Sequence, residues 1–200
     1  DLGYFPAGEL DQFTRLGSPF GDHPDMRKVI GADFSSGSLG HGLSVGVGMA
    51  LAARVQRRDH RVYVLLGDGE LAEGSNWEAA MAAAHYRLDN LVAILDHNTL
   101  QITGPTRKVM SNDPLDAKFA AFGWAVRTVN GHDYAQLTEA LTKPTPVGQP
   151  LVVIANTVKG RGVSFMENVG KWHHGVPSAE ELQQAMADLD AARARLEAVA

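Results

Sequence analysis

The chain has 200 residues, of which 44% are apolar and 20% charged, so it fits one globular domain over residues 1–200 and excludes a disordered chain. Its formal net charge of −5, without clustered Lys or Arg, argues against nucleic acid as a partner. Cys is absent and no apolar run approaches the roughly 18 residues of a membrane span, so we expect a cytoplasmic protein without membrane contacts.

The predicted elements begin after a lead-in, residues 1–38, that shows no strong period. A long helix of small residues over 39–57 follows it. Four short apolar runs without clean alternation come next, as is typical of strands covered on both faces: residues 62–66, 91–96, 125–129 and 151–157.

Helical patterns lie between these strands, over residues 75–88, 115–122 and 134–141. The first opens with Ser75-x-x-Glu78, which predicts a capping box. Strands that alternate with helices of this length predict an α/β fold, a doubly wound and mostly parallel sheet with helices on both faces.

Two segments lie outside this alternation. Residues 101–116 follow a strand end and are long for a loop, which is typical of functional or disordered segments. Ser178-x-x-Glu181 caps a final helix, residues 178–199. Its apolar residues recur at spacings of four and three, as a stripe that faces a partner subunit or, more commonly, packs on its own domain: Leu182, Met186, Leu189, Ala192, Leu196 and Val199.

Polar residues end two of the predicted strands, as Gly67-Asp68-Gly69 and as Asp96-His97-Asn98. Ligands of open α/β sheets collect outside the carboxyl ends of the strands, and neighbouring strands lie about 4.8 Å apart, so Asp68 and Asn98 can share an ion. Their hard oxygen atoms suit Mg²⁺, with Ca²⁺ as a substitute. The two glycines let the backbone approach a phosphate, so the sequence predicts a metal diphosphate site.

Either fragment alone is weak evidence, because Gly-Asp-Gly is usually a turn and Asn after a strand is usually a loop residue. The spacing strengthens the pair: 98 − 68 = 30 residues is enough for one strand-helix-strand unit and little more. Gly67-Asp68-Gly69, 98 − 69 − 1 = 28 intervening residues and Asn98 resemble the thiamine diphosphate motif. This resemblance implies that Asp68 and Asn98 bind Mg²⁺ by side chain and Leu100 by its carbonyl oxygen.

Further segments resemble transketolases, over nearly the whole chain: residues 35–42 (SSGSLGHG), 67–78 (GDGELAEGSNWE), 122–124 (FGW), 130–133 (NGHD) and 172–177 (WHHGVP). The N-terminal subunit of split transketolases is the closest type. It implies the thiamine diphosphate-binding fold and a set of cofactor-binding residues: Gly37, Ser38, Leu39, His41, Gly67, Asp68, Gly69, Glu70, Asn98 and His174. His41 stands where the family has Gln.

The same resemblance implies catalytic roles for three residues. His23 aligns, with one inserted residue, with a His that contacts substrate, and His174 with a His that reaches diphosphate and substrate. Glu73 aligns with a Glu in a carboxylate cluster at the subunit interface. On chemistry alone a lone His is more often a surface or capping residue, and the helix dipole favours Glu in a first turn. The turn at Lys159 can attract an anion, although a solvated loop is the commoner role.

The resemblance implies Mg²⁺- and thiamine diphosphate-dependent transfer of a two-carbon ketol group from a ketose phosphate to an aldose phosphate. No motif for the Glu that activates the cofactor is found, so we expect it from a C-terminal partner subunit, in a heterotetramer or a dimer through the cofactor interface. The alternatives are an α-type component of a 2-oxoacid dehydrogenase, a 1-deoxyxylulose-5-phosphate synthase, and, in another class, a non-catalytic cofactor-binding subunit. This sequence begins after the family's upstream segment with two active-site His motifs, and we expect that segment to be truncated, disordered or, in a reduced relative, truly absent.

Overall fold

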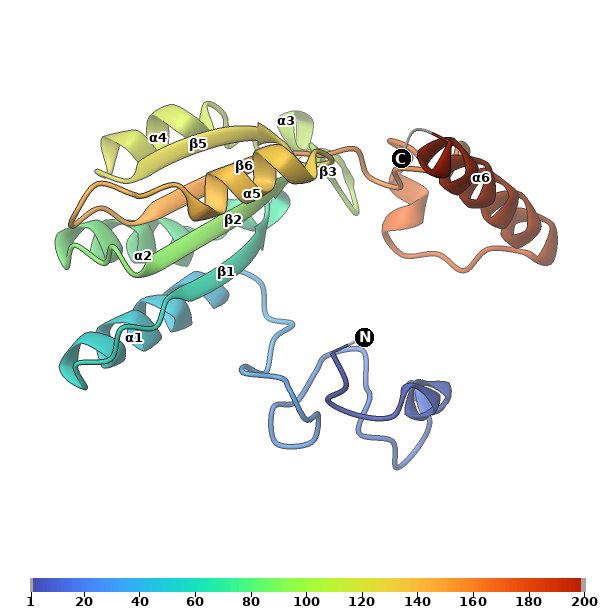
Figure 1. Ribbon diagram of the computed structural model, residues 1–200, viewed down its shortest axis with the longest axis horizontal. Helices are drawn as coiled ribbons and strands as arrows, with labels where there is room; N and C mark the ends of the chain where they lie inside the picture. Colours follow the sequence, from blue (N-terminus) through green and yellow to red (C-terminus); the bar gives the residue numbers. More distant parts are fainter. Residues whose placement is uncertain (1, 199–200) are drawn as a thin grey trace.

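The computed structural model describes residues 2–198 and contains a four-stranded sheet with helices on both faces (Figure 1). Its strands are β1 (Val62–Gly67), β2 (Leu91–His97), β5 (Ala125–Asn130) and β6 (Leu151–Asn156), in the order β1-β2-β6-β5. All pairs are parallel. The predicted α/β fold is therefore confirmed, and each predicted strand ends within one residue of the observed strand.

One face of the sheet carries α1 (Gly42–Val55), α2 (Gly74–His85) and α4 (Leu115–Ala121). Their apolar residues form the main core with the sheet residues that point to this side; its members include Leu43, Ala80, Leu95, Phe119 and Trp124. The small residues of α1 allow a close approach, since a Cβ atom on Gly46 would meet Val64 Cγ2 at 2.4 Å. The helix predicted over residues 39–57 is confirmed with shorter ends.

The opposite face carries α5 (Tyr134–Thr142), which packs over β5 and β6 around Val92, Leu151 and Val153. The carboxylate of Asp133 caps this helix by accepting from the Ala135 and Gln136 N–H groups. α5 does not extend over β1, where Tyr63 and Leu65 are 51% and 72% exposed. On this face, no helix within residues 2–198 covers the edge strand β1.

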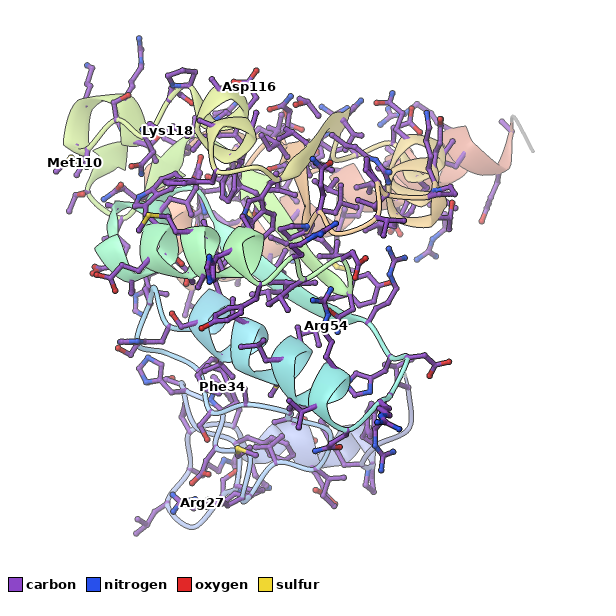
Figure 2. The ribbon with its side chains drawn as sticks, turned by 90° about the vertical axis from the view of Figure 1, so that its left-hand side faces the viewer. Arg27, Phe34, Arg54, Met110, Asp116 and Lys118 are labelled. Carbon is purple, nitrogen blue, oxygen red and sulfur yellow. The ribbon has the colours of Figure 1, made fainter. Side chains whose placement is uncertain are left out.

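The capping box predicted at Ser75 and Glu78 is wrong. Helix α2 begins at Gly74, its N-cap Glu73 makes no side-chain capping bond, and the Ser75 hydroxyl donates to Gly40 O at 2.8 Å. Ser75 thus forms its hydrogen bond with a loop 35 residues earlier in the chain and not with its own helix. At its other end α2 stops at His85, earlier than predicted, where Arg54 binds Tyr86 O at 2.6 Å (Figure 2).

The loop predicted over residues 101–116 is partly structured. β3 (Leu100–Gln101) and β4 (Gly104–Pro105) form a short antiparallel hairpin, and α3 (Thr106–Val109) follows it. Buried Thr106 donates its N–H to Thr99 O at 3.0 Å and its hydroxyl to the same oxygen at 3.3 Å. These bonds fix the chain directly after Asn98.

The described residues also form 3₁₀ helices: η1 (Ala7–Gln12) near the start of the chain, η2 (Gly69–Ala72) after β1, and η3 (Gly170–His173) between β6 and α6. Residues 2–40 run beside the sheet without entering it, and the chain after β6 continues past the carboxyl ends of the strands (Figure 1). Among residues 2–198, no helix has the length and apolar character that a membrane crossing needs.

The final helix, α6 (Ala179–Glu197), begins with the predicted capping box of Ser178 and Glu181. Most of its apolar stripe is exposed, so that stripe does not pack on the domain: Leu182, Met186, Leu189 and Leu196. The helix instead buries Ala185 and is tied to the preceding loop by Asp188, which accepts from the Ser164 N–H and hydroxyl. Residue 199 lies outside the described residues.

Candidate metal and diphosphate site

The structure brings Asp68 and Asn98 together at the carboxyl edge of the sheet. β1 and β2 are neighbours with Gly67 opposite Asp96, so the residues that follow each strand meet. The Thr99 N–H donates to Asp68 Oδ2 at 2.5 Å. Both side chains are buried, Asp68 with 3% and Asn98 with 8% of its surface exposed. The predicted proximity of the pair is confirmed.

The carboxyl group of Asp68 sits where a charge is costly. Burial raises its pKa, and hydrogen bonds from the Thr99 and Gly69 N–H groups together with nearby His97 oppose that shift only in part. Within residues 2–198, no Lys, Arg or His forms an ion pair with Asp68. A buried carboxylate without a cationic partner fits the binding of a metal ion.

The backbone between the predicted metal ligands is held in a sparsely populated conformation. Thr99 has a φ of 64°, which is costly for a β-branched residue and persists only where its surroundings determine it. Next to it, the Leu100 N–H donates to Asn98 Oδ1 at 3.0 Å. That amide oxygen retains a second lone pair, so it can still bind a metal ion.

The donor set suits a hard cation. In the described part of the chain no group of three or more His, Asp and Glu side chains gathers at one point. The candidate ligands are instead one carboxylate, one amide oxygen and one carbonyl oxygen, from Asp68, Asn98 and Leu100. Oxygen ligands of this kind suit Mg²⁺, which completes its octahedron with phosphate oxygens and water. The residues present therefore fit the predicted metal diphosphate.

The predicted cofactor loop before α1 is fastened to this site by Glu70. One carboxylate oxygen accepts from the Gly40 N–H at 2.9 Å, and the other accepts from the Gly67 N–H at 3.1 Å. Gly40 has a φ of 86° and lies so close to Glu73 that an added Cβ would meet Glu73 Cβ at 2.5 Å. Glu70, predicted to bind cofactor, thus also has a structural role that the sequence did not indicate.

His23 is placed directly over this loop. A Cβ atom on Gly37, whose φ is 139°, would meet the His23 ring at 2.1 Å. His23 and His41 are exposed, as are Ser38 and Leu39. The structure therefore joins one predicted catalytic residue to the predicted cofactor loop.

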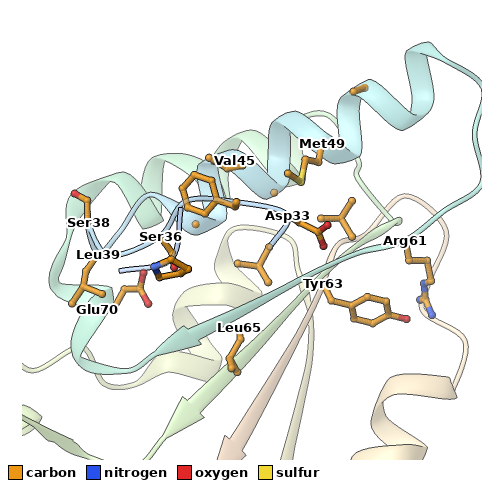
Figure 3. A pocket seen from close by; sticks show the side chains of 18 of the residues that line it. Asp33, Ser36, Ser38, Leu39, Val45, Met49, Arg61, Tyr63, Leu65 and Glu70 are labelled. Atoms are coloured by element: carbon orange, nitrogen blue, oxygen red, sulfur yellow. The ribbon is translucent and has the colours of Figure 1, made fainter. Parts of the chain in front are cut away.

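A cavity of about 960 Å³ starts at this loop and continues along the free edge of β1 (Figure 3). His23, Ser38 and Glu70 border one part of it, while Arg61 and Tyr63 border the part near the start of β1. Asp68 and Asn98 are not among its lining residues. The cavity therefore adjoins the candidate metal site without containing it.

Residues after β6 bring basic side chains close to β3. η3 lies against β3, which brings the segment of His173 and His174 beside Leu100. The Lys159 ammonium lies 3.3 Å from His173 Nδ1. Burial lowers the pKa of His173, and Lys159 and His174 lower it further by repulsion.

Lys159 belongs to the turn that the sequence predicts to be able to attract an anion, with a solvated loop as the commoner role. It lies three residues after the end of β6, which pairs with β2 in the middle of the sheet. Its position just past a strand end was a usable signal, because ligands of such sheets collect there. An ammonium group at that edge can neutralise a diphosphate.

Comparison with known proteins agrees with this arrangement. Residues 2–194 match the family model of the transketolase thiamine diphosphate-binding domain. One of the subunits of an apulose-4-phosphate transketolase from Actinobacillus succinogenes is 46% identical over 189 residues, which cover 94% of this chain and 68% of that protein. A 6-deoxy-6-sulfo-D-fructose transketolase subunit from a Clostridium species is 40% identical over 94% of this chain and 69% of its own length.

Solved structures give the same result. Transketolase from Campylobacter jejuni superposes with a TM-score of 0.85 at 32% identity, over 92% of this chain and 30% of that one. Transketolase from Leishmania mexicana superposes with a TM-score of 0.82 at 32% identity. The chain thus spans about a third of the solved transketolases and about two thirds of the apulose-4-phosphate transketolase subunit. It belongs to the transketolase family, of which it carries the N-terminal, thiamine diphosphate-binding part.

Proposed function

We propose that this chain is the cofactor-anchoring subunit of a two-subunit transketolase that moves a two-carbon ketol group from a ketose phosphate to an aldose phosphate. The observation that carries the proposal is the buried Asp68, without an ion pair among residues 2–198, beside Asn98 at the strand ends. The named activities of its relatives, on apulose 4-phosphate and 6-deoxy-6-sulfo-D-fructose, support ketose substrates outside the common pentose phosphates. The cytoplasmic location stays a prediction.

The residues of this chain hold the cofactor by its diphosphate. Asp68, Asn98 and the Leu100 carbonyl would bind Mg²⁺ on one side, and Lys159 with His174 would face the diphosphate from the other. Thiamine diphosphate, when bound, supplies a carbanion and an electron sink for C–C cleavage. Exposed His23 can donate to or accept from a substrate oxygen next to the loop of Gly37.

A partner chain completes this site. We assign to it the carboxylate that activates the cofactor, because no motif for that Glu was found in this sequence. The relatives from Actinobacillus succinogenes and Phocaeicola vulgatus are themselves named as one subunit of a transketolase, which supports a two-subunit enzyme. A heterotetramer, with Glu73 at the interface between subunits, is the assembly we propose, and exposed Glu73 is free to take part in it.

The decisive experiment assembles the full-length protein with its C-terminal partner subunit, Mg²⁺ and thiamine diphosphate. Ketol transfer is then measured across a panel of ketose donors, phosphorylated and sulfonated, with aldose phosphate acceptors. We expect transfer with both subunits present and none with either alone. An assembled complex that holds the cofactor but transfers nothing would overturn the proposal in favour of a non-catalytic cofactor-binding subunit.

A second experiment tests the metal site. We expect Asp68→Ala to abolish Mg²⁺-dependent binding of thiamine diphosphate in calorimetry, because the ion loses the carboxylate among its three candidate ligands. Asp59→Ala, an exposed residue ahead of β1, is the matched control and should bind normally. Equal affinity in the Asp68 variant and the control would count against the site.

A further inference from the structure

The segment that joins β6 to Lys159 is held from two sides. On the β2 side, the Thr157 N–H donates to His97 O at 3.2 Å and the Thr157 hydroxyl donates to the Asp96 carboxylate. On the β5 side, the Gly131 N–H donates to Asn156 O at 2.8 Å. Hydrogen bonds from both neighbouring segments therefore fix the backbone that leads to Lys159 directly after it leaves the sheet.

On the β5 side, Gly131 allows the loop after β5 to pack closely against the end of β6. A Cβ atom there would lie 2.4 Å from Thr157 Cγ2 and 3.2 Å from Asn156 O, so only Gly lets the two segments come so close. The next residue, His132, is fixed by its own N–H, which donates to Asn130 Oδ1 at 3.0 Å. The loop after β5 is thus rigid where it meets the end of β6.

From that position the ring of His132 reaches the neighbouring segment. Its Nε2 accepts from the Val158 N–H at 2.7 Å, a bond between residues 26 positions apart. Because Nε2 is the acceptor, the ring proton sits on Nδ1. Val158 directly precedes Lys159, so this bond sets the direction in which the chain enters the turn.

The far side of the turn is fixed as well. The Asn168 N–H donates to Lys159 O at 2.9 Å, and the Lys159 ammonium lies 3.3 Å from His173 Nδ1. The direction of the Lys159 side chain therefore depends on the bond that His132 makes ahead of it together with these contacts behind it.

We propose that His132 is a positioning residue, which aims the Lys159 ammonium at the cofactor's diphosphate by holding the Val158 N–H. This inference rests on the proposed function. His132 touches neither the cofactor nor the reacting atoms in this assignment, and acts through Lys159 alone.

The test is a double-mutant cycle in the full-length protein assembled with its partner subunit, read by calorimetry of thiamine diphosphate with Mg²⁺. His132→Leu should weaken binding about three- to tenfold, the range expected for one lost hydrogen bond. Lys159→Met should weaken it by about tenfold or more, since a charge-assisted contact is lost. In the Lys159→Met background, His132→Leu should have no further effect beyond about twofold.

Rescue separates this role from a merely structural one. His132→Gln carries an acceptor oxygen at similar reach and should restore binding to within about twofold, whereas shorter His132→Asn should not. His85→Leu, an exposed His at the end of α2 that does not line the cavity, is the control for a surface substitution and should bind normally. Amide hydrogen exchange at Val158 should speed up in His132→Leu and slow again in His132→Gln.

Distinct results overturn the two claims. If the unaltered complex does not bind thiamine diphosphate with Mg²⁺, the proposed function fails and the role of His132 fails with it. If the unaltered complex binds but His132→Leu binds equally well, or the two variants' effects multiply, only the role of His132 is wrong. Unchanged exchange at Val158 in His132→Leu would also overturn it.

Discussion

At the carboxyl edge of the sheet, Asp68 is buried as a carboxylate without an ion pair in the described residues, and burial raises its pKa. A carboxyl whose pKa is higher in the folded chain binds more protons there. Its contribution to the free energy of unfolding therefore falls as pH rises from the unfolded pKa of about 3.9 through the folded pKa. Above that value the cost is complete, and a bound cation offsets it.

Replacement of Asp68 by Asn should therefore leave the metal-free protein at least as stable at pH 7, because Asn still accepts from the Thr99 N–H without the buried charge. Any advantage of the variant should shrink towards pH 4, where the carboxyl of the original protein takes up its proton. Mg²⁺ with thiamine diphosphate should raise the melting temperature of the original protein and not of the variant. Thermal unfolding with and without the ligands checks this, with Asp59→Asn as control; a metal-free variant that melts lower at pH 7 would contradict it.

Among the elements, α1 shows why small residues matter for this sheet. Gly46 lets the helix lie directly on β1, with its hydrogen atoms against Val64. Gly48 of the same helix is exposed and has no atom within 4 Å of where its Cβ would lie. Two glycines two residues apart thus have opposite roles, one for packing and one without any contact.

Gly46→Ala should lower the free energy of unfolding by about 1–3 kcal/mol, because the new methyl group overpacks the contact with Val64. Gly48→Ala should raise it by about 0.5–1 kcal/mol, because Ala is the better helix former. Urea unfolding of both variants measures the difference. Equal effects of the two substitutions would show that α1 does not approach β1 as closely as the structure has it.

For the whole molecule, burial is unevenly distributed. Of residues 2–40, only Phe20 and Gly40 are buried, whereas the sheet and the helices on it hold the main core. That first segment still brings His23 against Gly37 of the predicted cofactor loop. Figures 1 and 2 show the course of the segment beside the sheet. Segments with few buried contacts open at low free energy, so we expect residues 2–40 to open more easily than the sheet and the helices on it.

Limited trypsin digestion should cut first at Arg15, Arg27 and Lys28, all exposed in this segment. Thiamine diphosphate with Mg²⁺ should slow cleavage at Arg27 and Lys28, because the bound cofactor orders the adjoining loop. Mass spectrometry of the first fragments identifies the sites. Arg54, whose guanidinium binds Tyr86 O and Asp89, is the internal control, and its earlier cleavage would contradict the prediction.

Much of the fold was predictable because its signals are local. An apolar run, a helical period and the capping box of Ser178 and Glu181 depend on residues near one another in the chain, and each was confirmed. The pairing of Asp68 with Asn98 followed from the same source. A single strand-helix-strand unit separates them, and such a unit places its strand ends side by side.

The contacts between distant segments were decided only by the tertiary structure. Ser75 bonds to Gly40 instead of capping its helix, and the loop after Asn98 folds into a hairpin. Residue spacing could not predict the hydrogen bond between His132 and Val158 or the contact between Lys159 and His173. By itself the sequence determined the sheet and the meeting of Asp68 with Asn98 at its edge, since local pattern dictates strands and their ends. Which polar and charged side chains the loops place at that edge depends on contacts between groups far apart in the sequence. No local period encodes such contacts.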